Sequence, residues 1–245
     1  MLSKAQNKYI RSLSQQKYRN EHQVFVAEGD KIALEWLNSD ADIKMIVGLQ
    51  DWIARHQASI KKHPHATVHV VEPHILEAIS TLKTPNMVLL VVGMPTKKHL
   101  NSYKWCLVLD DIQDPGNMGT IIRIADWFGW EQVVCSPGCV DVYNPKVIQS
   151  AMGGHLRVNI IVQDLSAYLQ QADKPVFAAA LQGDNIYQLP VQKEGILVIG
   201  NESKGISENI MKLATRKITI PRRGGAESLN AGVSAGILCA LLSGQ

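Results

Sequence analysis

The sequence predicts an α/β fold whose larger part is a parallel sheet covered by helices on both faces. Short runs rich in Val, Ile and Leu, each as long as a strand, alternate along the 245 residues with segments whose apolar residues recur at helical spacing. Such alternation is typical of strands joined by crossover helices. A hydrophobic content of 46% and a charged content of 19% are those of a globular chain that buries a core.

A polar segment containing Gly, Pro and Lys separates two alternating stretches and predicts two domains. We expect a smaller α/β domain over residues 1–95, a linker over 96–104 and a second domain over 105–245. In the first domain Pro73 suits the first turn of a helix, because that position needs no backbone N–H. The expected elements are strands over 22–29, 43–49, 67–72 and 86–92, and helices over 30–38, 51–63 and 73–83.

The second stretch alternates more regularly, which predicts the parallel sheet. Its expected strands cover 104–111, 131–136, 157–162, 175–181, 195–200 and 216–221, and its helices cover 117–129, 144–154, 165–173, 207–214 and 228–243. On the helix over 117–129, Ile121 and Ile122 belong to an apolar stripe, which leaves Gly119 and Arg123 on another side. Ligands of parallel sheets bind beyond the carboxyl ends of the strands, so the loops there are the candidate sites.

The start of the chain is basic. The first 20 residues hold five Lys and Arg side chains and no acidic one, with two tyrosines among them. Such a segment suits a phosphate backbone with an occasional stacked base, although a solvated helix face has the same composition. The candidate RNA contacts in this segment are Lys8, Arg11 and Arg19.

Other function classes are not favoured. The longest apolar runs are too short to span a bilayer, and early cations interrupt any signal peptide, so we expect a cytoplasmic protein without a membrane partner. Cys106 and Cys239 lie in apolar runs, as buried thiols do, and Cys135 and Cys139 lack the C-x-x-C spacing of a redox pair. The histidines of the first domain fall on different elements, so no metal site is expected.

Three loops at expected strand ends carry more polar residues than packing requires. The first, over 117–123, ends in an arginine near a helix N-terminus, where an anion is favoured, although an isolated arginine is usually an ordinary surface residue. The second, over 200–205, has glycines on both sides of Glu202, and Ser203 or Ser207 is also suited to cap a helix. The third, over 220–230, holds two arginines and two glycines before Ser-Leu-Asn.

These three motifs, N-x-G-x-x-x-R, G-N-E-x-x-G and I-P followed by E-S-L-N, occur in this order. In that respect the chain resembles the SpoU (TrmH) branch of the SPOUT class, which consists of S-adenosylmethionine-dependent RNA 2′-O-ribose methyltransferases. The resemblance covers roughly residues 105–242. More loosely, the start of the chain resembles the L30e-like RNA substrate-binding domain of that family.

The resemblance implies a deep trefoil knot in the C-terminal domain and a homodimer whose active site is built across the subunit interface. It implies that S-adenosylmethionine binds in the knot, without a metal. The matching cofactor positions are Leu181, Gly200, Ile220 and Leu229, and the implied catalytic residues are Asn117, Arg123, Glu202, Ser228 and Asn230. The small residues Ala231, Gly232 and Ala235 suggest a helix that another backbone or subunit approaches closely, and we expect the dimer interface to run along this helix, over residues 228–242.

The sequence departs from the family pattern at three places. Gln149 and Ala151 stand where many relatives have Arg and Ser, and Gly232 stands where many have a second serine after Ser-Leu-Asn. The favoured interpretation is methylation of ribosomal RNA, 23S rRNA in particular, or of tRNA, with no DNA partner expected. A non-catalytic RNA-binding relative is one alternative. A nicotinamide oxidoreductase is the other, and the absence of G-x-G-x-x-G makes it poor.

Overall fold

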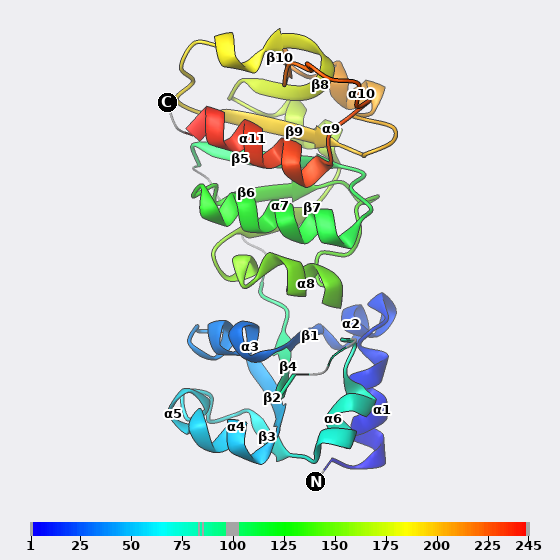
Figure 1. The fold of residues 1–245 in the computed structure, drawn as a ribbon, viewed down its shortest axis with the longest axis vertical. Coiled ribbons are helices and arrows are strands. Elements are labelled where there is room, and N and C mark those ends of the chain that lie inside the picture. The colour runs from blue at the N-terminus through cyan, green and yellow to red at the C-terminus, as the bar shows by residue number, and fades with distance from the viewer. Residues whose placement is uncertain (1, 83, 85, 97–102, 244–245) are drawn as a thin grey trace. The chain divides into compact units, whose positions relative to one another are not determined.

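The computed structural model describes residues 2–82, 84, 86–96 and 103–243, which form two compact units (Figure 1). The N-terminal unit comprises Met1–Thr96 together with Tyr143–Leu156, and the C-terminal unit comprises Lys97–Val142 with Arg157–Gln245. Most of the expected linker lies outside the described residues. The units differ from the expected domains in one respect, because residues 143–156 cluster with the N-terminal unit.

That segment packs on the first strand of the N-terminal unit. Helix α8 (Pro145–Ala151) contacts β1 (Val24–Glu28), and the ring of Tyr143 stacks on Phe25 with 5.0 Å between centroids. Gly153 adopts a φ of +86° beside the Glu35 side chain. The helix itself was predicted, but the unit to which it belongs was not.

The N-terminal unit is built on a four-stranded sheet of order β1-β4-β2-β3, in which β4 runs antiparallel to both neighbours and β2 and β3 are parallel. The expected helix over 51–63 is two helices, broken at His56, whose φ of −108° and ψ of 21° are not helical. The elements other than β1 and α8 are α1 (Lys4–Ser12), α2 (Gln16–His22), α3 (Asp30–Leu37), β2 (Ile43–Gly48), α4 (Gln50–Arg55), α5 (Gln57–Ile60), β3 (Thr67–Val70), α6 (Pro73–Ile79), β4 (Val88–Gly93) and η1 (Gly154–Leu156).

The C-terminal unit has a six-stranded sheet of order β10-β8-β9-β5-β6-β7, and every pair of neighbours is parallel. This confirms the predicted fold class, whereas the implied knot stays a prediction. The elements are β5 (Trp105–Asp110), α7 (Pro115–Trp127), β6 (Gln132–Cys135), β7 (Asn159–Val162), α9 (Leu165–Gln170), β8 (Val176–Asn185), η2 (Ile186–Gln188), β9 (Gly195–Gly200), α10 (Glu208–Met211), β10 (Arg216–Thr219) and α11 (Ala231–Ser243).

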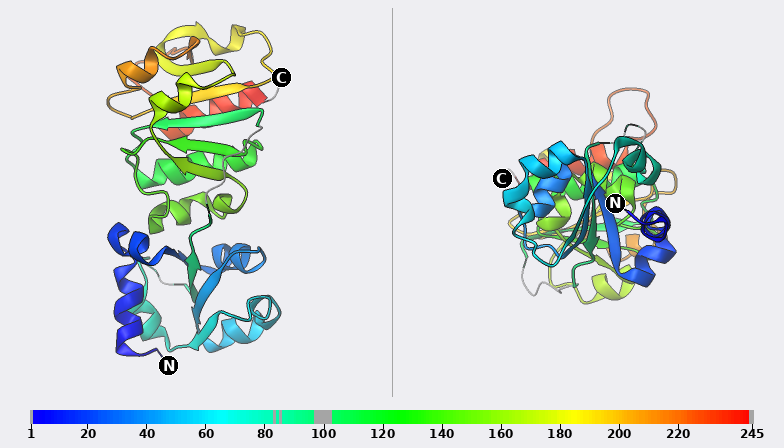
Figure 2. Two further views of the ribbon diagram at one scale, coloured as in Figure 1. Left: turned by 180° about the vertical axis from the view of Figure 1, so that it is seen from behind. Right: turned by 90° about the horizontal axis from the view of Figure 1, so that it is seen from below.

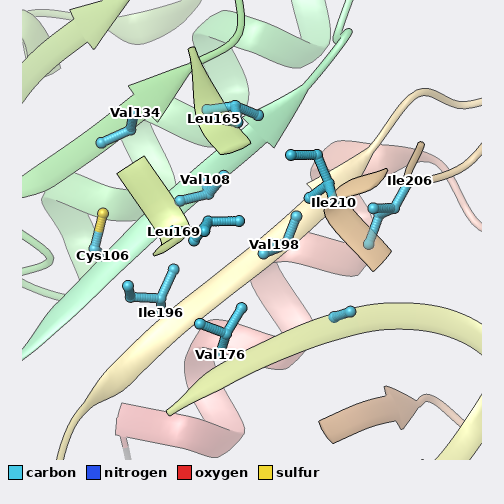
Figure 3. Close-up of a cluster of buried hydrophobic side chains, with 11 residues drawn as sticks. Cys106, Val108, Val134, Leu165, Leu169, Val176, Ile196, Val198, Ile206 and Ile210 are labelled. Atoms are coloured by element: carbon cyan, nitrogen blue, oxygen red, sulfur yellow. The ribbon is translucent and has the colours of Figure 1, made fainter. Parts of the chain in front are cut away.

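Helices cover both faces of this sheet. On one face, Leu165 and Leu169 of α9 and Ile210 of α10 pack against alternate residues of the strands, among them Cys106 and Val108 (Figure 3). The intervening residues of β5 are also fully buried and point to the opposite face, because side chains alternate along a strand.

The opposite face carries α7 and α11, which lie in front of the strands in Figure 1 and behind them in the reverse view of Figure 2. The two helices approach closely at small residues. A Cβ atom added to Gly232 would lie 3.1 Å from Cγ2 of Thr120, and one added to Gly236 would lie 3.5 Å from Cδ1 of Ile124. The glycines of α11 therefore serve packing within the chain.

Candidate active site at the carboxyl ends of the parallel strands

The first motif lies at the start of α7, directly after β5. Asp114 is the N-cap of this helix, and its carboxylate accepts the backbone N–H of Asn117 at 2.8 Å. Pro115 follows in the first turn. The helix N-terminus thus fixes the backbone of Asn117 at the carboxyl edge of the sheet.

Asn117 joins the three motifs in one chain of hydrogen bonds. Its Nδ2 donates to Oε1 of Glu202 at 2.5 Å, and its Oδ1 accepts from Nδ2 of Asn230 at 2.8 Å. The directions are consistent, because Oδ1 of Asn230 already accepts the N–H of Val233 at 3.2 Å and a carboxylate can only accept. The structure therefore brings together three of the predicted catalytic residues from segments far apart in the sequence.

The second motif is a tight loop after β9. The backbone of Asn201 pairs with that of Gly205 through N–H···O contacts of 3.1 and 2.9 Å, and Gly205 has a φ of +71°. Gly200 lies against this closure: an added Cβ would be 2.3 Å from the carbonyl carbon of Gly205. Glycine is required at position 200 by the loop itself, in addition to its expected place beside the cofactor.

Two predicted catalytic residues are not part of the hydrogen-bonded chain. Arg123 and Ser228 are exposed, and neither has a hydrogen bond or ion pair among the described residues. Trp127, one turn after Arg123 on α7, is 81% exposed. Gly119, expected beside Arg123 on the outer side, is buried instead. The outer face of α7 thus presents an unpaired cation and a large aromatic ring to solvent.

Three of the four positions expected to hold the cofactor lie within or directly after three neighbouring strands. Gly200 ends β9, Ile220 directly follows β10, and Leu181 lies in the extended β8, where its carbonyl accepts from Oγ1 of Thr219 at 3.2 Å. The side chains of Leu181 and Leu229 are 76% and 46% exposed. Exposed leucines at this edge of the sheet suit the apolar ring of a ligand, so these residues fit S-adenosylmethionine.

The structure corrects one expected RNA contact. Arg19 is 1% exposed, and its Nη1 donates at 2.8 Å to the carbonyl oxygens of Leu13 and Ser14. The side chain therefore stabilises the turn between α1 and α2 from the inside and is not available to a phosphate. Sequence composition could not separate this arginine from its neighbours.

The other two cations of this set are exposed on one face of α1. Together with Lys4 and Asn7, Lys8 and Arg11 line a shallow depression of about 260 Å³. The four residues have the i, i+3, i+4, i+7 spacing of neighbours on a helix surface. The N-terminal unit thus offers three clustered positive charges, which is the arrangement expected for a phosphate-binding face.

The small-residue face of α11 also needs correction. The sequence favoured this face as a dimer interface, but Ala231 and Ala235 are 4% and 0% exposed within a single chain. Gly232, one of the departures from the family pattern, faces Thr120 and Oδ1 of Asn230 at 3.1 and 3.2 Å from the position of an added Cβ. Of the other departures, Gln149 is half-buried and Ala151 is buried on α8.

The cysteines differ in their surroundings. Cys106 and Cys239 are buried, as expected, and burial raises the pKa of both thiols. Sγ of Cys139 lies 3.3 Å from the carbonyl oxygen of Leu109, and a hydrogen bond with Cys135 is the main reason that its pKa falls from 9.0 to about 7. Within the described residues, no cluster of three metal-ligating side chains occurs, and no helix is long and apolar enough to cross a membrane.

Each of the two units matches a protein-family model. Residues 104–240 match the model of the SpoU rRNA Methylase family, and residues 4–90 match the model of the MRM3-like substrate binding domain. The first match covers the six-stranded sheet and includes all five predicted catalytic residues. The second covers the basic helix α1.

Individual relatives agree with these models. The chain is 30% identical over 240 residues to the 23S rRNA (guanosine(2553)-2′-O)-methyltransferase RlmP of Bacillus subtilis, covering 96% of this chain and 94% of that protein. It is similar to the structure of a TrmH-family protein from Porphyromonas gingivalis, with 36% identity, a TM-score of 0.86, and coverage of 99% and 98%. It is also similar to an AdoMet-bound rRNA methyltransferase from Sinorhizobium meliloti, with 26% identity, a TM-score of 0.88, and coverage of 99% and 95%.

Proposed function

Because this chain belongs to the SpoU rRNA methylase family of RNA methyltransferases, we propose that it transfers a methyl group from S-adenosylmethionine to a ribose 2′-hydroxyl in ribosomal RNA. The observation that carries the proposal is the hydrogen-bonded chain of Glu202, Asn117 and Asn230 at the carboxyl edge of the sheet. The name of the Bacillus relative, a 23S rRNA 2′-O-methyltransferase, favours the ribose and the large-subunit RNA.

The cofactor supplies an electrophilic methyl group on sulfur, and the residues of this chain supply the geometry. A ribose 2′-hydroxyl must approach the methyl group in line and must lose its proton, so holding the ribose accounts for much of the expected rate enhancement. Only Oε1 of Glu202 is engaged by Asn117, which leaves the other carboxylate oxygen able to accept a hydrogen bond. Ser228, with its free hydroxyl, and Asn230 are placed to hold the ribose.

Arg123 is assigned to the phosphate next to the reacting ribose. A guanidinium remains protonated at all physiological pH values, so it is a poor proton acceptor and a good bidentate partner for phosphate. Its exposure and lack of a partner among the described residues support this role.

We further propose that the active protein is a homodimer. Arg123 is not joined to the Asn117 chain within the subunit, and the neighbouring Trp127 is 81% exposed on the same helix. A second subunit that covers the outer face of α7 would bury this ring and bring Arg123 toward a complete site. Sedimentation velocity over a dilution series tests this, and a monomer that keeps full activity at the lowest concentration would contradict it.

The test of the function uses ribosomal RNA from cells that lack the gene. Purified protein and methyl-labelled S-adenosylmethionine are incubated with this RNA or with total tRNA, and 2′-O-methyl groups are mapped by their resistance to alkaline cleavage. We expect one new ribose methylation in ribosomal RNA. Label in a base would contradict ribose specificity, and label in tRNA alone would show that the substrate is tRNA. RNA binding without label would favour the non-catalytic alternative.

Arg123→Ala provides the variant for this assay. We expect loss of methyl transfer of about 100-fold or more, because one charge-assisted contact to the reacting nucleotide is removed. Affinity for S-adenosylmethionine, measured by calorimetry, should stay near that of the wild type. Lys193→Ala, an exposed cation in the loop before β9, serves as the control. A parallel fall in cofactor affinity would place Arg123 on the cofactor side instead.

A further inference from the structure

The side chain of Asn201 links two loops of the candidate site. Its Nδ2 donates to the backbone carbonyl of Asp111 at 2.8 Å, while its Oδ1 accepts the N–H groups of Ser203 and Lys204 at 2.9 and 3.1 Å. The amide therefore uses its donor across the loops and its acceptor within its own turn. Because both ends of the amide are engaged, the turn over residues 201–205 is fixed relative to the end of β5.

The backbone conformation of Asp111 orients its carbonyl group toward the Asn201 amide. Asp111 is a non-glycine residue with a φ of +59°, and its N–H donates to Oγ of Ser136 at 3.0 Å. Asp is one of the few residues that adopt the left-handed region readily. Gly138 lies alongside, where an added Cβ would be 2.6 Å from Oδ1 of Asp111. The carbonyl of Asp111 is thus held toward Asn201 by its own backbone conformation and by the loop after β6.

Glu202 depends on this arrangement. It lies inside the turn that the Asn201 side chain closes, and its carboxylate meets the Asn117 amide at 2.5 Å. Two other contacts join the same loops. The N–H of Ser207 donates to the buried carboxylate of Asp110 at 2.7 Å, beyond the turn. Nζ of Lys204 lies 4.0 Å from Oδ2 of Asp111, but this is a long ion pair of an exposed side chain and constrains the turn less than the Asn201 amide does. If the turn over residues 201–205 rotated, the Glu202 carboxylate would therefore move away from the Asn117 amide.

We propose that Asn201 is a positioning residue for methyl transfer: its bond to the Asp111 carbonyl holds the Glu202 carboxylate against Asn117. The inference rests on the proposed function and adds a residue that does not itself touch the substrate. Asn201 acts through Glu202, so its contribution disappears once the Glu202 carboxylate is gone.

Asn201→Asp is the most selective variant. It keeps the shape and the acceptor toward Ser203 and Lys204, but it loses the donor and turns a carboxylate oxygen toward the Asp111 carbonyl. We expect kcat to fall about 10- to 100-fold with KM for RNA changed less than about twofold, because displacements near 1 Å at a reacting centre have effects of this size. Asn144→Asp is the matched control, since Asn144 caps α8 through Oδ1 and aspartate serves equally there.

A double-mutant cycle with Glu202→Gln decides how Asn201 acts. In the Glu202→Gln background, Asn201→Asp should lower kcat by less than about twofold, because residues in one network are not additive. Additive losses, or a Glu202→Gln variant with the kcat of the wild type, would overturn the inference. If Asn201→Asp does not fold, Asn201→Ser, which keeps an acceptor for the turn, carries the same expectation.

The two failures are distinguishable in this design. Wild-type protein that methylates no RNA contradicts the proposed function. Wild-type protein that methylates RNA, together with an Asn201→Asp variant of unchanged kcat, contradicts only the positioning role.

Discussion

Gly200→Ala is expected to destabilise the C-terminal unit strongly for a change of one methyl group. The added Cβ would lie 2.3 Å from the carbonyl carbon of Gly205, 2.4 Å from the nitrogen of Ile206 and 2.5 Å from the carbonyl oxygen of Gly205. All three are backbone atoms, so no side chain can rotate away. Relief requires that the loop opens, and this breaks the two backbone hydrogen bonds between Asn201 and Gly205.

The magnitude follows from these contacts. Overpacking a rigid site costs about 1–3 kcal/mol, and each backbone hydrogen bond that is lost adds about 1 kcal/mol. A total of about 3–5 kcal/mol corresponds to a fall in Tm of about 10–20 °C for a unit of this size. Scanning calorimetry measures it, and calorimetric titration with S-adenosylmethionine should show weaker binding as well.

Gly224→Ala is the matched control for this prediction. No atom lies within 4 Å of its added Cβ, and it too belongs to a loop at the carboxyl edge of the sheet. Its Tm should stay within about 2 °C of the wild type, as for an unconstrained surface site. If Gly200→Ala behaved like Gly224→Ala, the second loop would not have the closure described, and the position of Glu202 derived from it would be wrong.

Four further outcomes are expected. Replacing Lys8 and Arg11 by Gln should leave the Tm unchanged and should reduce the slope of log K for RNA binding against log salt concentration by about one unit per lost contact. Arg19→Gln should instead lower the Tm, because the carbonyl oxygens of Leu13 and Ser14 lose their hydrogen-bond donor. If this slope did not change, Lys8 and Arg11 would be solvated side chains that do not contact RNA. Ala235→Phe should unfold the C-terminal unit and not merely separate subunits, as circular dichroism would show. Alkylation of Cys139 by iodoacetamide should rise as pH increases through about 7, the pKa at which its thiolate forms, and a midpoint near 9 would contradict the contact with Cys135.

The fold class could be predicted from sequence because its signals are local. Strands such as β5 and β9 are buried on both faces and read as unbroken apolar runs, and glycines and polar residues directly follow them. The three motif loops were recognisable for the same reason. Local sequence signals do not show which element an apolar surface packs against. Helix α8 shows a buried face, yet only the structure reveals that this face packs with β1, so that the helix belongs to the N-terminal unit.

The same limit explains the two corrected residue assignments. Arg19 is one of five cations in a basic segment, and its burial depends on two carbonyls presented by the turn between α1 and α2. Small residues on α11 do predict close approach of another backbone, but that backbone is α7 of the same chain. The sequence places Asn201 in the second motif but shows no role for it, because its importance lies in a contact with Asp111, 90 positions earlier in the chain.

The predicted catalytic residues divide into two groups with different physical states. Asn117, Glu202 and Asn230 satisfy one another, which means that their geometry exists before any ligand arrives and costs nothing to reorganise. Arg123 and Ser228 are exposed and without partners among the described residues. In the proposed function, the exposed guanidinium of Arg123 loses side-chain freedom only when a phosphate of the RNA binds to it. Under the proposed function, the preorganised amides and carboxylate would keep the reaction geometry fixed within one protomer, while the RNA phosphate and the proposed second subunit would complete the site around Arg123.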